Sequence, residues 1–260
     1  MWMPDNAFEE CAGHFWGIHG TRDYMRAKFA YLETMMALGT PTSLTEALKE
    51  GLDCLRLCRA DNLGVREHVS AIYVRLGRLQ EGYDFIKWWA TCDPDGRYDW
   101  GDMSLPYLTI KNADMTESVS CFERAYSLPH FGALTFIKFY AAQSLSDLIG
   151  AETASEKLPG GLESAVSTFL PFSEAASKSK STQKLREKVS AQAKKAFGMA
   201  HKHNKHYWKA MLHPDEFMNQ PPPQYISQGS MVEARSAFEH IFPAWHATPG
   251  GLDFIRQNLQ

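Results

Sequence analysis

The side chains best suited to chemistry in this sequence include a group of arginines and carboxylates near two predicted helix starts. Arg22 and Arg26 lie one helical turn apart, and Arg66 follows shortly after Asp61 and Asn62. On the concave face of a helix stack, these guanidinium groups would bind a partner's carboxylate through paired hydrogen bonds. Buried ion pairs between neighbouring helices explain the same residue types equally well. Both interpretations stay open at this point.

The second group of candidates is aromatic and acidic. Trp88 and Trp89 are adjacent, so on a helix they point about 100° apart, and one can face a groove while the other packs in the core. Tryptophan is enriched among residues that dominate binding energy. Tyr98, Asp99 and Trp100 follow in an acidic loop, which would either bind a ligand or a basic peptide or cover the helical core. We expect the covering role.

Histidines and cysteines give weaker signals. His203 and His206 share a helical face, but lysines are interleaved with them, and a metal site needs three or four convergent ligands. Cys54 and Cys58 are one turn apart on an apolar stripe, where a thiol packs as a small hydrophobe. The sequence contains no Gly-rich nucleotide loop and no local nucleophile–base motif. We therefore predict no metal and no cofactor, and we assign no catalytic residue.

The balance of charge argues against a dedicated nucleic-acid binder. The 260 residues include 27 basic and 30 acidic side chains, with a formal net charge of −3, whereas nucleic-acid binding needs a basic surface. One local exception is the lysine-rich stretch 178–209. It suits either a solvated helix face or a surface for phosphate or acidic partners.

The sequence also predicts where the protein resides. The amino-terminal residues lack the basic and apolar regions of a secretory signal. Polar residues interrupt the longest apolar stretch, 131–149, so we expect no membrane span. The five cysteines are an odd number and are scattered, as is typical of reduced thiols. We predict a protein of the cytoplasm or nucleus.

Helical periodicity supplies the elements that position these residues. Apolar residues recur every three or four positions in four segments of the first ninety residues, which predicts helices over 22–38, 44–58, 65–76 and 79–90. Gly39 and Pro41 end the first, and Ser43 with Glu46 fits a capping box for the second. The Leu-Gly turns at Gly39 and Gly77 lie 38 residues apart, close to the roughly 34-residue tetratricopeptide period. Gly82 stands where the third and fourth helices would cross.

The second half of the chain is less regular. We predict a short extended segment at 105–110 and helices over 117–126, 131–149, 184–210 and 231–247, the last of these ending at a Pro-Gly-Gly turn. An irregular Ser/Lys-rich connector spans 151–183, and three prolines at 221–223 form a rigid link. The fold class predicted for residues 1–260 is all-α, a single helical-repeat domain forming a tetratricopeptide-like superhelix of antiparallel helix pairs.

Several blocks of the sequence, taken together, resemble a known family. They occur at 15–18, 21–27, 55–66, 75–78, 83–89, 98–102, 229–230, 233–234, 244–245 and 248–250. These blocks resemble the helical region of fungal MYND-type zinc-finger proteins and are similar to bacterial tetratricopeptide proteins of undefined role. A MYND finger needs closely spaced cysteine pairs, and this sequence has no Cys-x-x-Cys motif. The resemblance therefore implies the helical scaffold without the finger or its roles.

Two hypotheses about function follow. The first is an intracellular helical-repeat scaffold that binds a protein or peptide partner. The alternative is an enzyme of unassigned type, with a pocket covered by the Tyr98–Asp102 loop. The sequence gives no residue that would choose the reaction.

Overall fold

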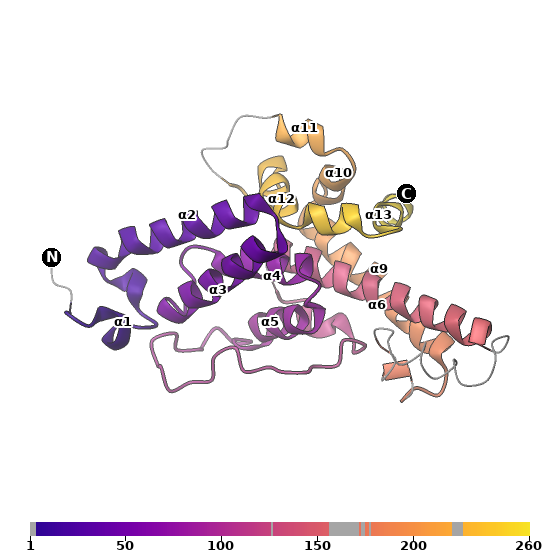
Figure 1. The fold of residues 1–260 in the computed structure, drawn as a ribbon, viewed down its shortest axis with the longest axis horizontal. Helices are drawn as coiled ribbons and strands as arrows, with labels where there is room; N and C mark the ends of the chain where they lie inside the picture. Colours follow the sequence, from indigo (N-terminus) through magenta and orange to yellow (C-terminus); the bar gives the residue numbers. More distant parts are fainter. Residues whose placement is uncertain (1–3, 126, 156–171, 173–174, 177, 220–225) are drawn as a thin grey trace.

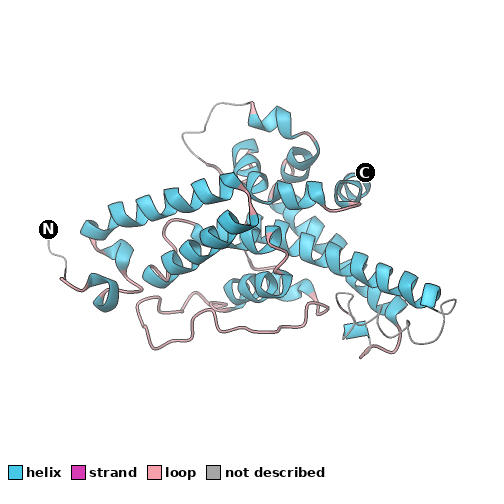
Figure 2. Ribbon diagram, in the orientation of Figure 1, coloured by secondary structure: helices cyan, strands magenta, loops and turns pink. Residues whose placement is uncertain are grey.

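The computed structural model describes residues 4–125, 127–155, 172, 175–176, 178–219 and 226–260. Over these ranges the chain is helical and contains no β-strand (Figure 2), which confirms the all-α prediction. The α-helices are α1 (Ala7–Glu10), α2 (Arg22–Leu38), α3 (Pro41–Leu57), α4 (Val65–Arg75), α5 (Leu79–Thr91), α6 (Leu128–Ser155), α9 (Thr182–His203), α10 (Tyr207–Leu212), α11 (Pro214–Met218), α12 (Met231–Ala247) and α13 (Gly251–Leu259). Short 3-10 helices are η1 (Phe15–Gly17), η2 (His19–Thr21) and η3 (Val119–Phe122).

Helix boundaries in the first half follow the local signals closely, with one correction. Helix α2 ends at Gly39, which takes the left-handed conformation with φ 67°. Helix α3 begins at Pro41 and not at residue 44, because Thr40 caps it: the Thr40 side chain accepts from the Ser43 N–H, and Ser43 bonds back to the Thr40 N–H. The predicted Ser43–Glu46 capping box is therefore wrong. Proline opens this helix, where its missing N–H costs nothing.

Successive helices from α2 to α5 pack against one another, and two glycines allow close crossings. A Cβ at Gly51 would lie 2.7 Å from Val69 Cγ2 and 3.0 Å from Leu32 Cδ1, between α2, α3 and α4. A Cβ at Gly82 would lie 3.0 Å from Tyr73 Cβ, at the crossing of α4 with α5. Any larger residue must push these helices apart. The predicted close approach at Gly82 is confirmed.

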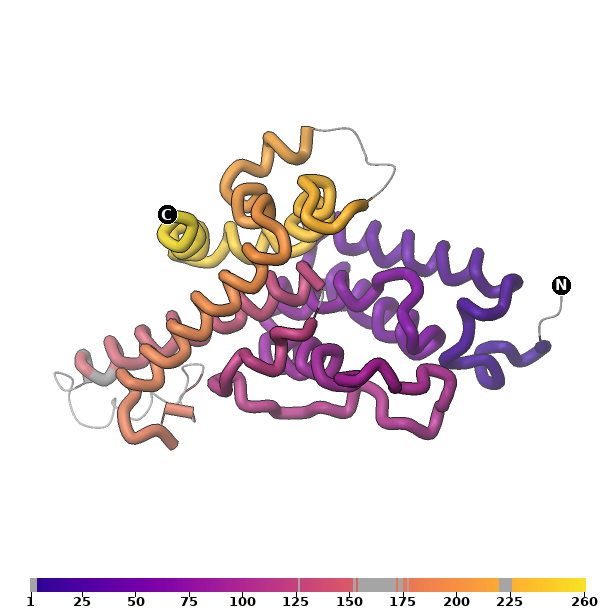
Figure 3. Tube along the Cα trace, turned by 180° about the vertical axis from the view of Figure 1, so that it is seen from behind, coloured from indigo at the N-terminus to yellow at the C-terminus, as the bar shows by residue number. Residues whose placement is uncertain are grey.

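Helix α4 is the centre of the packing. It contacts α3, α5, α6 and α12, and Figure 1 shows it between α5 on one side and α10–α13 on the other. Sequential pairing stops after α5, because α6 packs along α9, as Figure 3 shows from behind. Helix α6 is apolar on nearly all sides, which is typical of a helix surrounded by protein.

A buried lysine ties three segments together inside this core. Lys138 of α6 is fully buried, and its Nζ donates to the backbone oxygens of Met115 and Glu117 at 2.6 and 2.8 Å and to Gln192 Oε1 of α9 at 2.9 Å. Burial lowers the pKa of Lys138 to about 8. The loop just before Met115 is held in a similar way. The buried Asp84 of α5 accepts hydrogen bonds from the backbone N–H groups of Asn112 and Ala113.

Four predictions for the second half need correction. Within 117–125, the described part of the helix expected over 117–126, the structure has only the turn η3, and the segment predicted to be extended at 105–110 is interrupted by Leu108, whose φ is 51°. The helix expected over 184–210 breaks at Asn204, whose side chain bonds Ser230 O and Glu233. Helix α12 matches the prediction, but α13 follows it, because Gly250 with φ 74° starts a new helix. Most of the 151–183 connector and the prolines 221–223 lie outside the described residues.

No helix within the described ranges is both long enough and apolar enough to cross a membrane. The buried apolar core runs from Ala7 to Ile255 and draws on both halves of the chain.

Candidate functional site

A cleft of about 610 Å³ lies where the start of α4, the end of α5 and the start of α6 meet. We call it the arginine–tryptophan cleft. The residues of its lining used below are Arg66, Trp89, Cys92, Asp93, Trp100, Arg124, Ser127 and His130. Three of them belong to the sets predicted from sequence.

Aromatic rings form one wall of this cleft. The Trp89 and Trp100 rings stack with centroids 5.5 Å apart and planes at 18°. Behind them Trp88 is buried and makes edge contacts with Tyr107 at 4.9 Å and Tyr98 at 5.9 Å. The expectation that one adjacent tryptophan is core and the other lies at a groove is confirmed.

The loop after α5 is held in place by its own polar groups. Asp93 accepts from the backbone N–H groups of Arg97 and Tyr98 at 2.6 and 2.9 Å, which forms the first turn. Further on, the Tyr98 hydroxyl donates to Pro106 O at 2.7 Å. Arg59 then donates to Asp102 O and Leu105 O, so the loop is tied back to the end of α3. The covering role predicted for Tyr98 and Trp100 is present, and Trp100 also faces the cleft.

Asp61 and Arg66 belong to a capping arrangement at the start of α4. Asp61 is buried, with φ 53°, and accepts from the backbone N–H groups of Val65 and Arg66 at 2.8 and 3.0 Å. Arg66 Nε lies 3.6 Å from Asp61 Oδ2, and its guanidinium carbon lies 4.7 Å from the centre of the Trp89 ring. Burial raises the pKa of Asp61 despite these donors. Arg66 is thus held beside the stacked tryptophans at the cleft wall.

The floor of the cleft carries groups that are neutral at pH 7. Burial lowers the pKa of His130 to about 3, and its Nε2 lies 3.3 Å from Arg66 O, so Nε2 carries the proton. Burial raises the pKa of the Cys92 thiol to about 11. The exposed Arg124 makes no ion pair within the part of the chain that the structure describes. Arginine therefore supplies the positive charge of the cleft, opposed by Asp93.

The remaining predicted residues lie elsewhere. Arg22 and Arg26 both contact the Trp16 ring, at 5.3 and 5.5 Å from its centre, and Arg22 Nε donates to Trp16 O at 2.8 Å. Among the described residues, Arg26 forms an ion pair with the exposed Asp23 of its own helix and with no other carboxylate. The suggested buried Arg–Asp pairs are therefore wrong for these two arginines, and neither residue lines the cleft.

Asn62 and Asp99 also make local contacts. Asn62 Oδ1 accepts from the Cys58 thiol at 3.2 Å. Asp99 Oδ1 accepts from the Gly101 N–H at 2.8 Å, which closes a turn within the loop. Both residues are exposed and are absent from the lining of the cleft.

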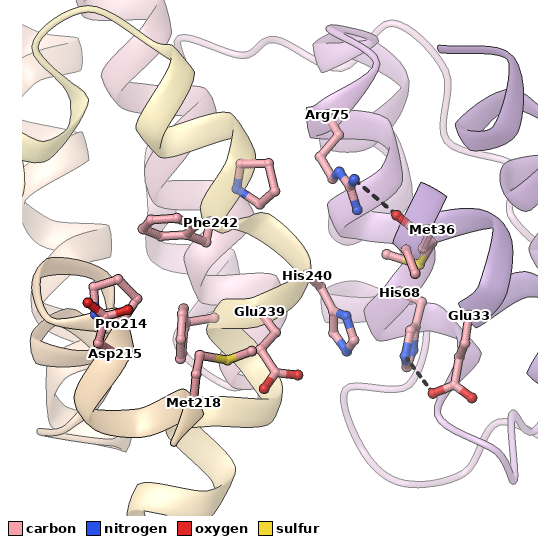
Figure 4. Close-up of a pocket in the computed structure, with 13 residues that line it drawn as sticks. Glu33, Met36, His68, Arg75, Pro214, Asp215, Met218, Glu239, His240 and Phe242 are labelled. Carbon is pink, nitrogen blue, oxygen red and sulfur yellow. Dashed lines mark hydrogen bonds and ion pairs between the residues drawn. The ribbon is translucent and has the colours of Figure 1, made fainter. Parts of the chain in front are cut away.

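A second cavity, of about 550 Å³, escaped the sequence analysis. It lies between α2 and α4 on one side and α11 and α12 on the other (Figure 4). We call it the histidine pocket, after His68 of α4 and His240 of α12, whose ring centres are 4.1 Å apart. Both histidines stand at ordinary positions on amphipathic helices, so only the packing of distant helices reveals the pair.

The other sequence candidates are in structural roles. His203 contacts Glu233 at 3.1 Å, and no three His, Cys, Asp or Glu residues within the described ranges are arranged to hold a metal ion. Burial raises the pKa of Cys54 to about 12, as expected of a packed thiol. In the lysine-rich stretch, Lys195 pairs with Glu123 at 2.6 Å.

Comparisons with protein-family models, with curated proteins and with solved structures found no match for this chain. The functional proposal therefore rests on the residues of the arginine–tryptophan cleft.

Proposed function

We propose that this chain is a helical-repeat scaffold that binds an acidic segment of a protein or peptide in the arginine–tryptophan cleft. In this proposal α2–α5 form two tetratricopeptide-like pairs, in line with the resemblance to the helical region of fungal MYND-type proteins. The observation that carries it is the placement of Arg66 over Trp89, beside the Trp89–Trp100 stack.

The chemistry of the cleft favours a carboxylate next to an apolar or aromatic group. Arg66 and Arg124 bring two guanidinium groups to the cleft, and guanidinium binds carboxylate in a bidentate fork. The indole N–H of Trp89 is buried and has no acceptor among the described residues, so an entering acceptor would remove an unfavourable unpaired donor. The tryptophan faces offer apolar contact area of the kind found at binding hot spots.

The fixed shape of the cleft supports binding of a flexible partner. The loop that carries Trp100 is held by Asp93 and Arg59, and Asp61 holds Arg66 at the start of α4. A site that is ordered before binding loses little conformational entropy on association. Most of the conformational entropy lost on binding is then lost by the flexible partner.

The test is selection of peptides from a random displayed library by the immobilised protein. We expect enrichment of sequences with Asp or Glu next to an aromatic or large apolar residue. The double variant Arg66→Ala with Arg124→Ala should lose this enrichment, and the matched control Arg56→Ala, which removes an exposed arginine paired with Asp53 on α3, should keep it. Equal enrichment by the double variant, or none by the native chain, would overturn the proposal. Thermal melting checks that each variant is folded.

A further inference from the structure

The histidine pocket combines an apolar lining with two acceptor groups, on Glu33 and His68, that receive no hydrogen bond from any described residue. Its walls include Met36 of α2, Met218 of α11, and Phe238 and Phe242 of α12. A volume of about 550 Å³ falls within the range typical of small-molecule sites. Figure 4 shows the two histidines meeting across the gap between the two groups of helices.

The proton on His68 can be placed from its contacts. His68 Nδ1 lies 3.3 Å from Gly64 O, a contact that requires the proton on Nδ1. Burial lowers the pKa of His68 to about 3, so at neutral pH the imidazole is uncharged and Nε2 is an acceptor. The side chain is only 12% exposed. Its free acceptor is therefore largely shielded from water.

A second acceptor faces the first. Glu33 Oε1 lies 3.9 Å from His68 Nε2. With His68 neutral, this contact joins two acceptors with no proton between them, so it is not a true ion pair. Partial burial raises the pKa of Glu33, because desolvation disfavours the charged carboxylate, and no described Lys or Arg forms an ion pair with it.

One cation, Arg75, lines the pocket, but no ion pair between it and Glu33 is formed among the described residues. Arg75 donates to Met36 O at 3.1 Å, and Glu239 is paired with Arg235 at 2.7 Å. His240 makes no hydrogen bond to any described residue, and burial lowers its pKa to about 4, so it too is neutral. The part of the pocket between α2 and α4 thus presents the Glu33 carboxylate and a neutral imidazole nitrogen of His68, while Arg75, Asp215 and Glu239 complete its charged lining.

We propose that the histidine pocket binds a small organic amine, whose apolar body lies against Met218, Phe238 and Phe242 and whose ammonium group sits between Glu33 and His68. The ammonium would donate to both acceptors, which charge-assisted hydrogen bonds favour. This site is separate from the arginine–tryptophan cleft, and the inference does not rest on the function proposed for that cleft.

The test compares three probes on each of two apolar bodies. Naphthylmethylamine, naphthalenemethanol and naphthoate form one set, and adamantylamine, adamantanol and adamantane carboxylate form the other. Binding is measured at pH 7.5 by calorimetry and by ligand-observed NMR. In at least one set we expect the amine to bind about tenfold or more tightly than its alcohol, with the carboxylate weakest, since a hydrogen bond to a charged group adds that much.

Matched variants locate the amine. Glu33→Gln keeps the shape of a half-exposed side chain and should reduce amine affinity about tenfold while leaving the alcohol unchanged. The control Glu46→Gln removes an exposed carboxylate of α3 that pairs with Lys49, and it should change neither. The inference is overturned if no amine binds better than its alcohol, or if Glu33→Gln and Glu46→Gln behave alike. Thermal melting establishes that both variants are folded.

Discussion

The arginine–tryptophan cleft and the histidine pocket are of similar size but are built in opposite ways. The lining of the cleft comes from residues 66–130, and that of the pocket joins residues 33–75 to residues 214–243. The cleft carries arginines with aromatic rings, whereas the pocket carries neutral histidines, three carboxylates, one arginine and methionines. A cavity made by neighbouring segments leaves traces in the sequence, and one made by distant segments does not.

The two cavities also differ in what would disturb them. Capping and loop hydrogen bonds hold the cleft, because Asp61, Asp93 and Arg59 each bond to backbone groups. The pocket depends on how closely α2 packs on α3 and α4, and on how α12 packs on α4. Substitutions at helix crossings should therefore affect the pocket most, and polar substitutions should affect the cleft.

The largest expected effect is overpacking of a helix crossing. Gly51→Leu should reduce the free energy of unfolding by about 1–3 kcal/mol or more, because even a Cβ would lie 2.7 Å from Val69. Gly82→Leu should cost less, since the nearest atom, Tyr73 Cβ, is 3.0 Å away. Urea denaturation measures both. A smaller loss for Gly51→Leu than for Gly82→Leu would contradict the idea that α3 packs more tightly against α2 and α4 than α5 packs against α4.

Acid should destabilise the histidine pocket. The pKa values of His68 and His240 fall from 6.5 to about 3 and about 4 on folding, through burial and, for His240, the charge of Arg75. The unfolded chain therefore binds more protons below pH 6.5, so this stability is fully present above pH 6.5 and is lost as the pH falls through about 4 for His240 and about 3 for His68.

The measurement is the free energy of unfolding of the native chain and of the His240→Phe variant, each determined by urea denaturation at several pH values. Between pH 6.5 and 4.5, His240→Phe should reduce the slope of the free energy of unfolding against pH by about 1.4 kcal/mol per pH unit, which corresponds to about one proton. Glu33, which faces His68, is present in both proteins, so its own contribution to the pH dependence cancels in the difference. Parallel curves for the two proteins would show that His240 is not held neutral by the fold.

Loss of the α4 cap should weaken the arginine–tryptophan cleft. Asp61→Ala should reduce the free energy of unfolding by about 0.5–2 kcal/mol, because it removes the acceptor for two backbone N–H groups. Asp61→Asn should cost less, since Asn tolerates the left-handed conformation at φ 53° and keeps one acceptor. Thermal melting distinguishes the two, and equal midpoints would argue against the cap.

The smallest effect is expected at the amino-terminal end of α2. Arg22→Ala with Arg26→Ala should reduce the free energy of unfolding by about 1 kcal/mol or less, because the arginines contact the Trp16 ring, Arg22 adds one hydrogen bond to Trp16 O, and the Arg26–Asp23 pair is exposed. Peptide selection by the cleft should be unchanged. A drop in melting temperature of many degrees would require buried partners that the structure does not place there.

Local signals account for what the sequence predicted correctly. Gly39, with its positive φ, ended α2 as expected, and the adjacent Trp88 and Trp89 separated into core and cleft. Helix α13 was missed because the glycine pair at Gly250 looks like an end, yet its left-handed first residue starts a helix. Whether a helix begins after this glycine pair depends on the packing of Ile255 in the core and not on the turn itself.

The candidate site residues also divide into those that local spacing predicted and those that only the three-dimensional packing reveals. Helical spacing correctly placed Arg22 and Arg26 on one face, but their partner Trp16 lies in a 3-10 turn that periodicity does not detect. No spacing rule connects His68 to His240, because their contact requires α12 to return to α4 after the intervening α6 and α9. The pocket could therefore be found only from the three-dimensional packing.

The buried lysine in α6 has a consequence for the exchange of backbone hydrogens with solvent. Lys138 binds the Met115 and Glu117 carbonyls, and Asp84 binds the amides of Asn112 and Ala113. These two amides belong to no helix, yet both are held by the buried carboxylate of α5. They should exchange more slowly than the other amides of this loop, through local separation of the loop from α5.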